Sequence, residues 1–281
     1  MTIIQWFPGH MKKTLQDISK NLKLVDCVLI ILDARIPFSS MNFSFLKLLN
    51  NKPFLVLFNK SYLADLQQNS FFINYFHKKK IHTLNIDSKN IFNIHKIYPK
   101  VKEMLKINNV KLKKILKLMV IGVPNVGKST LINVLSNKKV TKTANLPGIT
   151  KKIQWINLQK NVMLLDTPGC LWNKFEFPEI GYSLAVCGCL KESVFSKEKF
   201  IIHHLNYLKK YYPLYLQKIF HLTDLELQKK DNLFQIVAEK IRIYNHFHVQ
   251  MENDLLSFIF KKIKNNFIYK INYDLDLKYL F

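Results

Sequence analysis

Short apolar runs alternate with segments of helical spacing through the first 170 residues of the chain. The apolar runs have the length of strands and lie at residues 27–32, 54–58, 82–86, 117–121 and 162–165. The segments between them carry apolar side chains at the spacing of an amphipathic helix, at residues 11–24, 42–49, 66–79, 94–105 and 129–135. Strands that alternate with helices predict an α/β fold, with a mainly parallel sheet and helices on both faces. Ligands of such sheets bind beyond the carboxyl ends of the strands.

The pattern changes after about residue 176. Turns that contain glycine become rare, and apolar residues recur at helical spacing, most clearly at residues 225–247 and 255–263. We therefore predict an α/β domain over residues 1–176 and an all-helical, basic domain over residues 177–281. The tail at residues 267–281 alternates Tyr, Ile and Leu with Asp and Lys, which leaves a strand, an extended arm and disorder open.

Composition narrows the class of protein. Hydrophobic residues make up 48% of the 281 residues, which is enough to bury a core. No apolar run reaches about 18 residues, so the sequence predicts no membrane-spanning helix. The N-terminal sequence MTIIQWFPGHMKK lacks the basic-then-apolar order of a secretion signal, and we expect a cytoplasmic protein. The four cysteines form no Cys-x-x-Cys pair, and reduced thiols fit their scatter better than zinc or disulfides.

The chain is strongly basic, with a formal net charge of +24 and a pI near 9.8. Nucleic acid is the commonest polyanion that exploits such a charge. Compositional drift is an equal alternative, because Lys, Asn and Ile are abundant throughout, as in AT-rich genomes. An acidic membrane surface is a weaker explanation of the charge, since no helical segment has the pattern of an amphipathic helix with a basic face.

The sequence GVPNVGKST, residues 122–130, has the spacing of a phosphate-binding loop between a strand and a helix. Gly122 and Gly127 let successive N–H groups curl around a β-phosphate. Lys128 supplies a positive charge to the β- and γ-phosphates, and the Ser129 hydroxyl binds Mg²⁺. The start of the following helix adds its positive end. The other candidate nucleotide-binding residues of the loop are Asn125, Val126 and Thr130.

A second phosphate motif, DTPG, follows the apolar run at residues 162–165. Asp166 stands where a carboxylate holds Mg²⁺, often through water, and the N–H of Gly169 can reach the γ-phosphate. Thr150, in the sequence PGIT, lies between the two phosphate motifs. It is the candidate switch threonine, which closes on Mg²⁺ only when a γ-phosphate is present. Together, these motifs indicate a GTPase.

Motifs for the base precede the phosphate motifs along this chain. Asn59 and Lys60 close one apolar run, and the sequence Asp87-Ser88-Lys89 follows another. We expect Ser88 and Lys89 to flank guanine O6 through backbone N–H groups and packing. Base motifs normally follow the phosphate motifs in a GTPase, so this order indicates a circularly permuted P-loop GTPase domain that keeps the same site in space.

The base motif departs from the usual Asn-Lys-x-Asp, in which the carboxylate accepts guanine N1–H and N2–H. Tyr62 stands at the place of that aspartate and cannot accept both hydrogen bonds. Asp65 lies three residues further on and could substitute if the turn is repositioned. The alternative is weaker selection of guanine. Because Asn59 and Lys60 remain, we expect GTP rather than ATP.

These motifs carry a resemblance to a known family. The sequences QWFPGHM, DARIP, FNK, GVPNVGKSTLIN, PGIT and LLDTPG, the last followed by Trp172, span residues 5 to about 190. The chain resembles the YlqF/RbgA family of circularly permuted ribosome-assembly GTPases. The resemblance implies a bacterial or organellar factor that binds GTP and GDP and acts late in maturation of the large ribosomal subunit. It further implies that the chain binds rRNA, is stimulated by the particle and is a monomer.

The resemblance also implies roles in hydrolysis. Many GTPases place Gln just after the DTxG glycine to orient the attacking water, but Cys170 and Leu171 stand there in this chain. In the resembling family that role is assigned to the histidine of PGHM, which is His10 here, and we predict His10, Lys128 and Thr150 as the catalytic residues. Alternatively, His10 caps the helix that follows it or binds rRNA phosphate. In similar cation-dependent GTPases, the asparagine at the position of Asn125 helps bind K⁺.

Two functions remain open from the sequence. The first is a GTPase of ribosome assembly that binds rRNA in its GTP state, with Lys174, Lys191, Lys209, Lys210, Lys229, Lys230, Lys261 and Lys262 as candidate phosphate contacts. The second is a nucleotide-holding, RNA-binding assembly factor with negligible hydrolysis or relaxed base specificity. A P-loop kinase or ATPase is disfavoured by the Asn59-Lys60 motif and by DTPG. Arg35 faces phosphate or RNA, or forms a salt bridge with Asp33.

Overall fold

The structure is a computed structural model that describes residues 9–110, 114–141, 153–159, 161–171, 175–229, 232–244, 252–265 and 269–279. For a few of these residues, among them Gly9 and His10, it describes only the backbone. The chain forms two compact units. Unit 1 comprises Met1–Lys191 together with Asn272–Phe281, and unit 2 comprises Glu192–Ile271. No helix in the described ranges is long and apolar enough to cross a membrane.

Unit 1 is built on a six-stranded sheet with the strand order β3-β2-β1-β4-β6-β5. The strands are β1 (Cys27–Asp33), β2 (Phe54–Asn59), β3 (Thr83–Asn85), β4 (Leu116–Ile121), β5 (Gln154–Gln159) and β6 (Val162–Asp166). All neighbours run parallel except β5, which is antiparallel to β6. The five strands expected from apolar runs are therefore confirmed. The sequence QWINLQ of β5 was missed because this edge strand leaves Trp155 half exposed and has no continuous apolar run.

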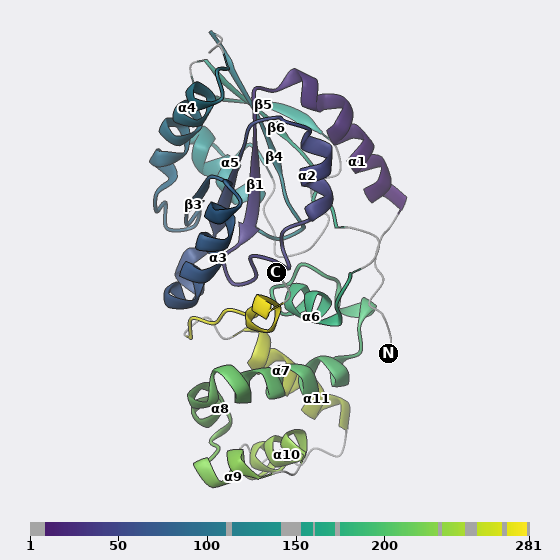
Figure 1. Ribbon diagram of the computed structural model, residues 1–281. Helices are drawn as coiled ribbons and strands as arrows, with labels where there is room; N and C mark the ends of the chain where they lie inside the picture. Colours follow the sequence, from purple (N-terminus) through teal and green to yellow (C-terminus); the bar gives the residue numbers. More distant parts are fainter. Residues whose placement is uncertain are drawn as a thin grey trace. The chain divides into compact units, whose positions relative to one another are not determined.

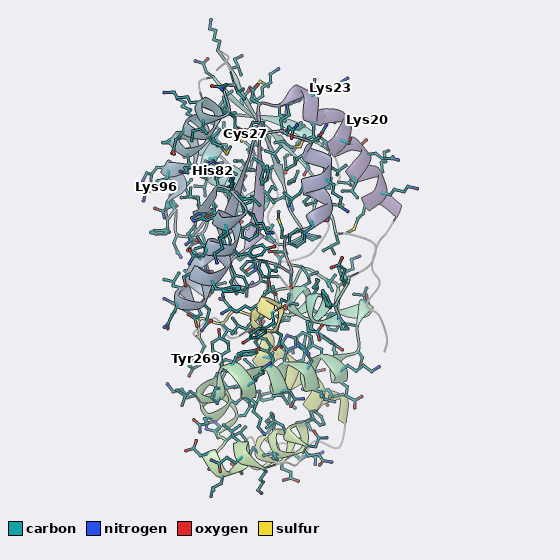
Figure 2. All side chains as sticks on the ribbon, in the orientation of Figure 1. Lys20, Lys23, Cys27, His82, Lys96 and Tyr269 are labelled. Atoms are coloured by element: carbon teal, nitrogen blue, oxygen red, sulfur yellow. The ribbon has the colours of Figure 1, made fainter. Side chains whose placement is uncertain are left out.

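Helices flank this sheet on both sides. They are α1 (Gly9–Asn21), α2 (Phe43–Leu49), α3 (Leu66–Lys78), α4 (Ile97–Ile107), α5 (Lys128–Ser136) and α6 (Pro178–Val186). Figure 1 shows α1 and α2 on one side of the sheet and α4 and α5 on the other. Every residue of β1, at the centre of the sheet, is buried. Figure 2 places Cys27 of β1 among the packed side chains, while Lys20 and Lys23 extend outward from the region of α1. The mainly parallel α/β architecture is thus confirmed.

Unit 2 is helical. Its helices are α7 (Lys197–Tyr211), α8 (Pro213–Phe220), α9 (Asp224–Gln228), α10 (Leu233–Tyr244) and α11 (Glu252–Lys264). The helical spacing over residues 225–247 is divided between α9 and α10, and a local cap at Asn232 explains where α10 begins. Thr223 and Glu226 form a capping box that begins α9, and Asn232 Oδ1 accepts a hydrogen bond from the N–H of Phe234 at the start of α10.

The compact units divide further along the chain than the expected boundary between residues 176 and 177. Helix α6 belongs to unit 1, where Leu184 and Ala185 are fully buried. The hydroxyl of Ser183 in α6 donates to the carbonyl oxygen of Tyr273 at 2.7 Å. Apolar burial makes α6 part of unit 1, although its sequence has the helical spacing of the segments that follow.

The tail returns to unit 1 through buried polar contacts. Asp274 is fully buried, and its carboxylate accepts hydrogen bonds from the N–H groups of Phe38 and Ser39, each at 2.8 Å. The N–H of Tyr273 donates to the carbonyl oxygen of Arg35 at 2.8 Å. Residues 275–279 then form a short 3₁₀ helix. Neither a strand nor disorder describes residues 272–279, whose fold depends on partners far away in sequence.

Candidate nucleotide-binding site

The phosphate-binding loop joins β4 to α5 through a turn that requires glycine. Gly127 precedes α5 with a φ of 95°, in the left-handed region that favours glycine. A Cβ on Gly127 would lie 2.3 Å from the side-chain nitrogen of Asn59, and a Cβ on Gly122 would lie 2.5 Å from the carbonyl oxygen of Ile31. The loop therefore packs directly against β1 and β2, which brings the N-terminus of α5 to their carboxyl ends.

Lys128 is buried at the head of α5. Its ammonium donates hydrogen bonds to the carbonyl oxygens of Gly122 at 3.1 Å and Val123 at 2.9 Å. Burial lowers the pKa of Lys128 to about 8, although the nearby Asp166 carboxylate acts in the opposite direction. A buried ammonium with neutral partners favours an anionic ligand, because phosphate oxygens offer it stronger, charge-assisted hydrogen bonds.

Asp166 ends β6 next to Val120 of β4, and its side chain is fully buried. Neither carboxylate oxygen has a hydrogen-bond partner among the described residues. Burial raises the pKa of Asp166 to about 6, against the lowering effect of the Lys128 ammonium. A buried carboxylate without hydrogen bonds is costly, and its oxygens fit a hard cation such as Mg²⁺. Ser129, in the first turn of α5, is the other described candidate ligand, and Thr150 lies outside the described residues.

The DTPG segment packs against the phosphate-binding loop. A Cβ on Gly169 would lie 2.8 Å from the Cα of Pro124, and the N–H of Cys170 donates to the carbonyl oxygen of Gly122 at 3.3 Å. The Thr167 hydroxyl donates to the carbonyl oxygen of Val120 at 2.7 Å. The two phosphate motifs, which are separated in sequence by β5 and β6, therefore lie together. Thr130 sits in the first turn of α5 and is half-buried there.

Cys170 and Leu171, at the usual position of a water-orienting glutamine, are both fully buried. The Cys170 thiol donates to the carbonyl oxygens of Met11 at 3.6 Å and Leu171 at 3.3 Å. Burial raises the pKa of this thiol to about 12, so it stays protonated. These contacts bring the start of α1 against the DTPG segment. The side chain of His10, one residue before Met11, lies outside the described residues.

Asn59 joins the base motif to the phosphate-binding loop. Its amide nitrogen donates to the carbonyl oxygen of Val126 at 2.8 Å. Its amide oxygen accepts from the N–H of Ser88 at 3.0 Å and from the Ser88 hydroxyl at 2.9 Å. The N–H of Lys89 donates to Asp87 Oδ1 at 2.9 Å, and the Lys89 side chain is exposed. The structure thus brings the two base motifs together at the phosphate-binding loop, while their contact with guanine O6 stays a prediction.

Lys60 continues this connection with a left-handed φ of 59°. Its ammonium donates to the carbonyl oxygen of Asn125 at 2.6 Å and lies 3.0 Å from Asp33 Oδ2. Asp33 also pairs with Arg35, whose guanidinium approaches it to 2.7 Å. Burial alone would raise the pKa of Asp33, but the Arg35 and Lys60 charges outweigh it and hold the pKa below its ordinary value. The salt-bridge alternative for Arg35 is therefore the one that the structure supports.

The loop after α6 also reaches the phosphate-binding loop, which the sequence analysis missed. Asn125 has a φ of 61°, and its amide nitrogen faces the carbonyl oxygens of Cys187 at 3.4 Å and Gly188 at 3.3 Å. Gly188 has a φ of 72°, and a Cβ there would lie 2.9 Å from that nitrogen. Glycine is scarce in this chain, and Gly188 is one of only seven. That scarcity was the signal in the sequence that could have pointed to this position.

Comparisons with known proteins agree with this geometry. A family model described as 50S ribosome-binding GTPase matches residues 117–246. The chain is 40% identical to ribosome biogenesis GTPase A of Bacillus licheniformis over 229 residues, which cover 79% of this chain and 81% of that protein. It is 36% identical to the mitochondrial ribosome-associated GTPase 1 of Mus musculus over 219 residues, which cover 73% of this chain and 67% of that protein.

Solved structures support the same fold. A GDP-bound structure of TM YlqF aligns with a TM-score of 0.53 at 22% identity, covering 92% of this chain and 97% of that chain. A GNP-bound structure of YlqF from T. maritima aligns with a TM-score of 0.50 at 23% identity, covering 89% of this chain and 93% of that chain. At these identities the likeness concerns the fold. Taken with the sequence relatives and the converging nucleotide motifs, it shows that the chain is a GTP-hydrolysing P-loop enzyme and belongs to the ribosome biogenesis GTPase A (YlqF/RbgA) family.

Proposed function

We propose that this GTPase acts in ribosome assembly, late in maturation of the large subunit, and binds rRNA in its GTP state. The observation that carries the proposal is the junction at Asn59, which links both base motifs to the phosphate-binding loop in a chain whose relatives are named for ribosome biogenesis. The net charge of +24 suits a polyanionic partner such as rRNA. The protein works as a cytoplasmic monomer on the particle.

In this proposal Mg²⁺ is held by Asp166 and Ser129, with Thr150 joining when a γ-phosphate is present. The buried, unpartnered carboxylate of Asp166 supports this assignment. When bound, Mg²⁺ neutralises the charge that develops on the β- and γ-phosphate oxygens. Lys128 adds a second positive charge at the same oxygens, and the N–H groups at the start of α5 orient the phosphates.

His10 is proposed to orient the attacking water. The polar group that usually does so is absent at Cys170, which is buried against α1. The same contact brings the backbone of Met11, the neighbour of His10, to the DTPG segment. A neutral imidazole at this place accepts a hydrogen bond from water and holds it in line with the γ-phosphate. His10→Ala is expected to lower the hydrolysis rate strongly while GTP affinity changes little.

Asn125 is proposed to help bind K⁺ beside the phosphates. The side-chain amide of Asn125 turns its nitrogen toward two carbonyl oxygens, because the nitrogen can donate hydrogen bonds and the amide oxygen cannot. The amide oxygen is therefore the atom that can act as a ligand. K⁺ would offset phosphate charge where other GTPases use an arginine. The described chain offers Arg35 near the site, but Asp33 already engages that guanidinium.

The proposed switch follows from chain order. The DTPG segment continues along the chain through α6 to Lys191, the last residue before unit 2, and the loop after α6 contacts the phosphate-binding loop at Asn125. A γ-phosphate that repositions DTPG would therefore act on the segment that enters unit 2. The GTP state would present the basic surface to rRNA, and hydrolysis would release it.

The test measures binding to large subunits and phosphate release in parallel. Binding with a non-hydrolysable GTP analogue is expected to exceed binding with GDP, and Lys128→Ala is expected to abolish the difference. Equal affinity in both nucleotide states would reject the switch. Phosphate release is expected to rise when large subunits are added, and to be faster in K⁺ than in Na⁺.

The second candidate function is a nucleotide-holding RNA-binding factor with negligible hydrolysis. Tyr62, in place of the usual aspartate, favours it. This second function predicts the same binding to large subunits. It also predicts no phosphate release, with or without large subunits, in either K⁺ or Na⁺. Release that depends on particles and is lost in His10→Ala would reject it.

A further inference from the structure

The structure shows what stands where a GTPase usually reads guanine. Tyr62 follows Asn59 by three residues and lies in a short 3₁₀ helix, Ser61–Leu63, directly after β2. Its side chain is 36% exposed, and its hydroxyl has no hydrogen-bond partner among the described residues. Asn59 and Lys60, which precede it in the motif, both contact the phosphate-binding loop. Tyr62 therefore stands at the base-reading position of the motif, with part of its surface exposed to solvent.

Asp65 does not take over the reading role, because it serves as the N-cap of α3. Its Oδ1 accepts hydrogen bonds from the N–H groups of Gln67 at 3.0 Å and Gln68 at 3.2 Å. Its own N–H donates to Asn272 Oδ1 at 2.9 Å, so the returning tail fixes its backbone. To reach a base, Asp65 would have to abandon the cap and leave the first N–H groups of the helix unsatisfied.

The other two carboxylates near Tyr62 are also engaged. Asp87 accepts hydrogen bonds from the N–H groups of Lys89 at 2.9 Å and Asn90 at 3.2 Å, which close its own loop. Asp33 holds Lys60 and Arg35. Both aspartates are therefore already engaged with protein groups. Among the residues that the structure describes, the polar group that the Asn59 motif offers at its fourth position is therefore the neutral hydroxyl of Tyr62.

A hydroxyl and a carboxylate read guanine differently. A carboxylate has two oxygens and accepts the N1–H and N2–H hydrogen bonds together, with the added strength of a full charge. A tyrosine hydroxyl has a single oxygen, so it accepts one of these two hydrogen bonds, and it does so without a charge. A base that lacks the 2-amino group, such as hypoxanthine, therefore loses little in this site.

We propose that Tyr62 is the specificity-determining residue of the base site, and that the site binds guanine and hypoxanthine nucleotides nearly alike because a single tyrosine hydroxyl does not read the 2-amino group. This inference rests on the proposed nucleotide site and deepens it. The substrate class widens from GTP to 6-oxopurine nucleoside triphosphates, with ITP as the second member. The Asn59 and Lys60 contacts that hold the phosphate-binding loop are unaffected by Tyr62.

The test is a competition titration on the full chain, with GDP and IDP displacing a fluorescent GDP analogue. The wild type is expected to bind GDP and IDP within about threefold, the margin of a weak neutral hydrogen bond. Tyr62→Asp is expected to raise the preference for GDP over IDP by about tenfold or more, since it restores a charged acceptor. Tyr62→Phe is expected to weaken GDP and IDP equally.

Asp65→Ala is the matched control. It is expected to lower the thermal unfolding temperature through loss of the α3 cap and to leave the ratio of GDP to IDP affinity unchanged. A wild-type preference for GDP of about tenfold or more would overturn the proposal, and its loss in Asp65→Ala would assign base reading to Asp65. Unchanged affinities in Tyr62→Phe would remove Tyr62 from the role. If the wild type binds neither nucleotide better than Lys128→Ala does, the nucleotide site itself is rejected, which is a different outcome.

Discussion

Asp274 and Ser39 are 235 positions apart in sequence and share two hydrogen bonds. The Ser39 hydroxyl donates to Asp274 Oδ1 at 2.5 Å, and the Ser39 N–H donates to Asp274 Oδ2 at 2.8 Å. Ser39 belongs to the segment that follows Asp33, the last residue of β1, and that also carries Arg35. The last described part of the chain therefore holds in place the segment that supports Lys60 and the base motifs.

Replacing Asp274 with alanine is expected to destabilise unit 1. The change leaves the buried N–H groups of Phe38 and Ser39 without their acceptor, at a cost of about 3 kcal/mol in the free energy of unfolding. Urea denaturation of the full chain measures this cost. Tyr279→Ala, in the same tail but 85% exposed, is the control and is expected to change stability by less than about 0.5 kcal/mol. Equal effects of both changes would contradict the role of the buried carboxylate.

Asp274 also predicts a pH dependence of stability. Burial raises its pKa to about 6, above its ordinary value of 3.8. Between these values the folded state holds a proton that the unfolded state has lost, so this group makes stability fall as pH rises from about 4 to about 6. The expected contribution is up to ~3 kcal/mol. Asp274→Asn keeps two donors satisfied without a titrating group. The unfolding free energy of the wild type, measured relative to that of Asp274→Asn, should therefore fall as pH rises across this window. A constant difference would contradict the prediction.

Replacing Gly188 with alanine is expected to impair the stimulation of hydrolysis by K⁺. The new Cβ would lie 2.9 Å from the amide nitrogen of Asn125, at a φ of 72° that strains alanine. Phosphate release in KCl and in NaCl measures the stimulation, and a fall toward the level of Asn125→Ala is expected. The double variant should be no worse than Asn125→Ala alone, because both changes act through one contact. Additive losses would show that Gly188 acts elsewhere.

Asp33→Asn is expected to weaken both stability and nucleotide binding. It leaves the buried Arg35 charge and the half-buried Lys60 charge without their carboxylate, at a cost of about 3 kcal/mol in unfolding free energy. Lys60 then also loses the anchor that holds it at the phosphate-binding loop, and GDP affinity should fall by about tenfold. The control is Glu103→Gln, which breaks the exposed pair with Lys100 and should cost less than about 0.5 kcal/mol. A stable Asp33→Asn with normal GDP affinity would contradict this reasoning.

Much of the fold could be read from short stretches of the sequence. The strands β1, β2, β4 and β6 were predictable because their apolar runs are continuous, whereas β5 was not, because its sequence QWINLQ has no continuous apolar run and leaves Trp155 half exposed. The phosphate-binding loop was predictable because its glycines, lysine and serine act within nine consecutive residues. The break between α9 and α10 was missed because a local cap at Asn232 overrode the continuous helical spacing.

The sequence by itself determined the nucleotide chemistry and the permuted order of its motifs, because backbone turns, periodic burial and phosphate contacts are set by neighbouring residues. Only the tertiary structure decided that Asp65 caps α3, that Gly188 lies against Asn125 and that Asp274 returns to Ser39. Each of these is a choice of partner for a buried polar group. Such a choice depends on which distant segments packing brings together, and no local pattern records it.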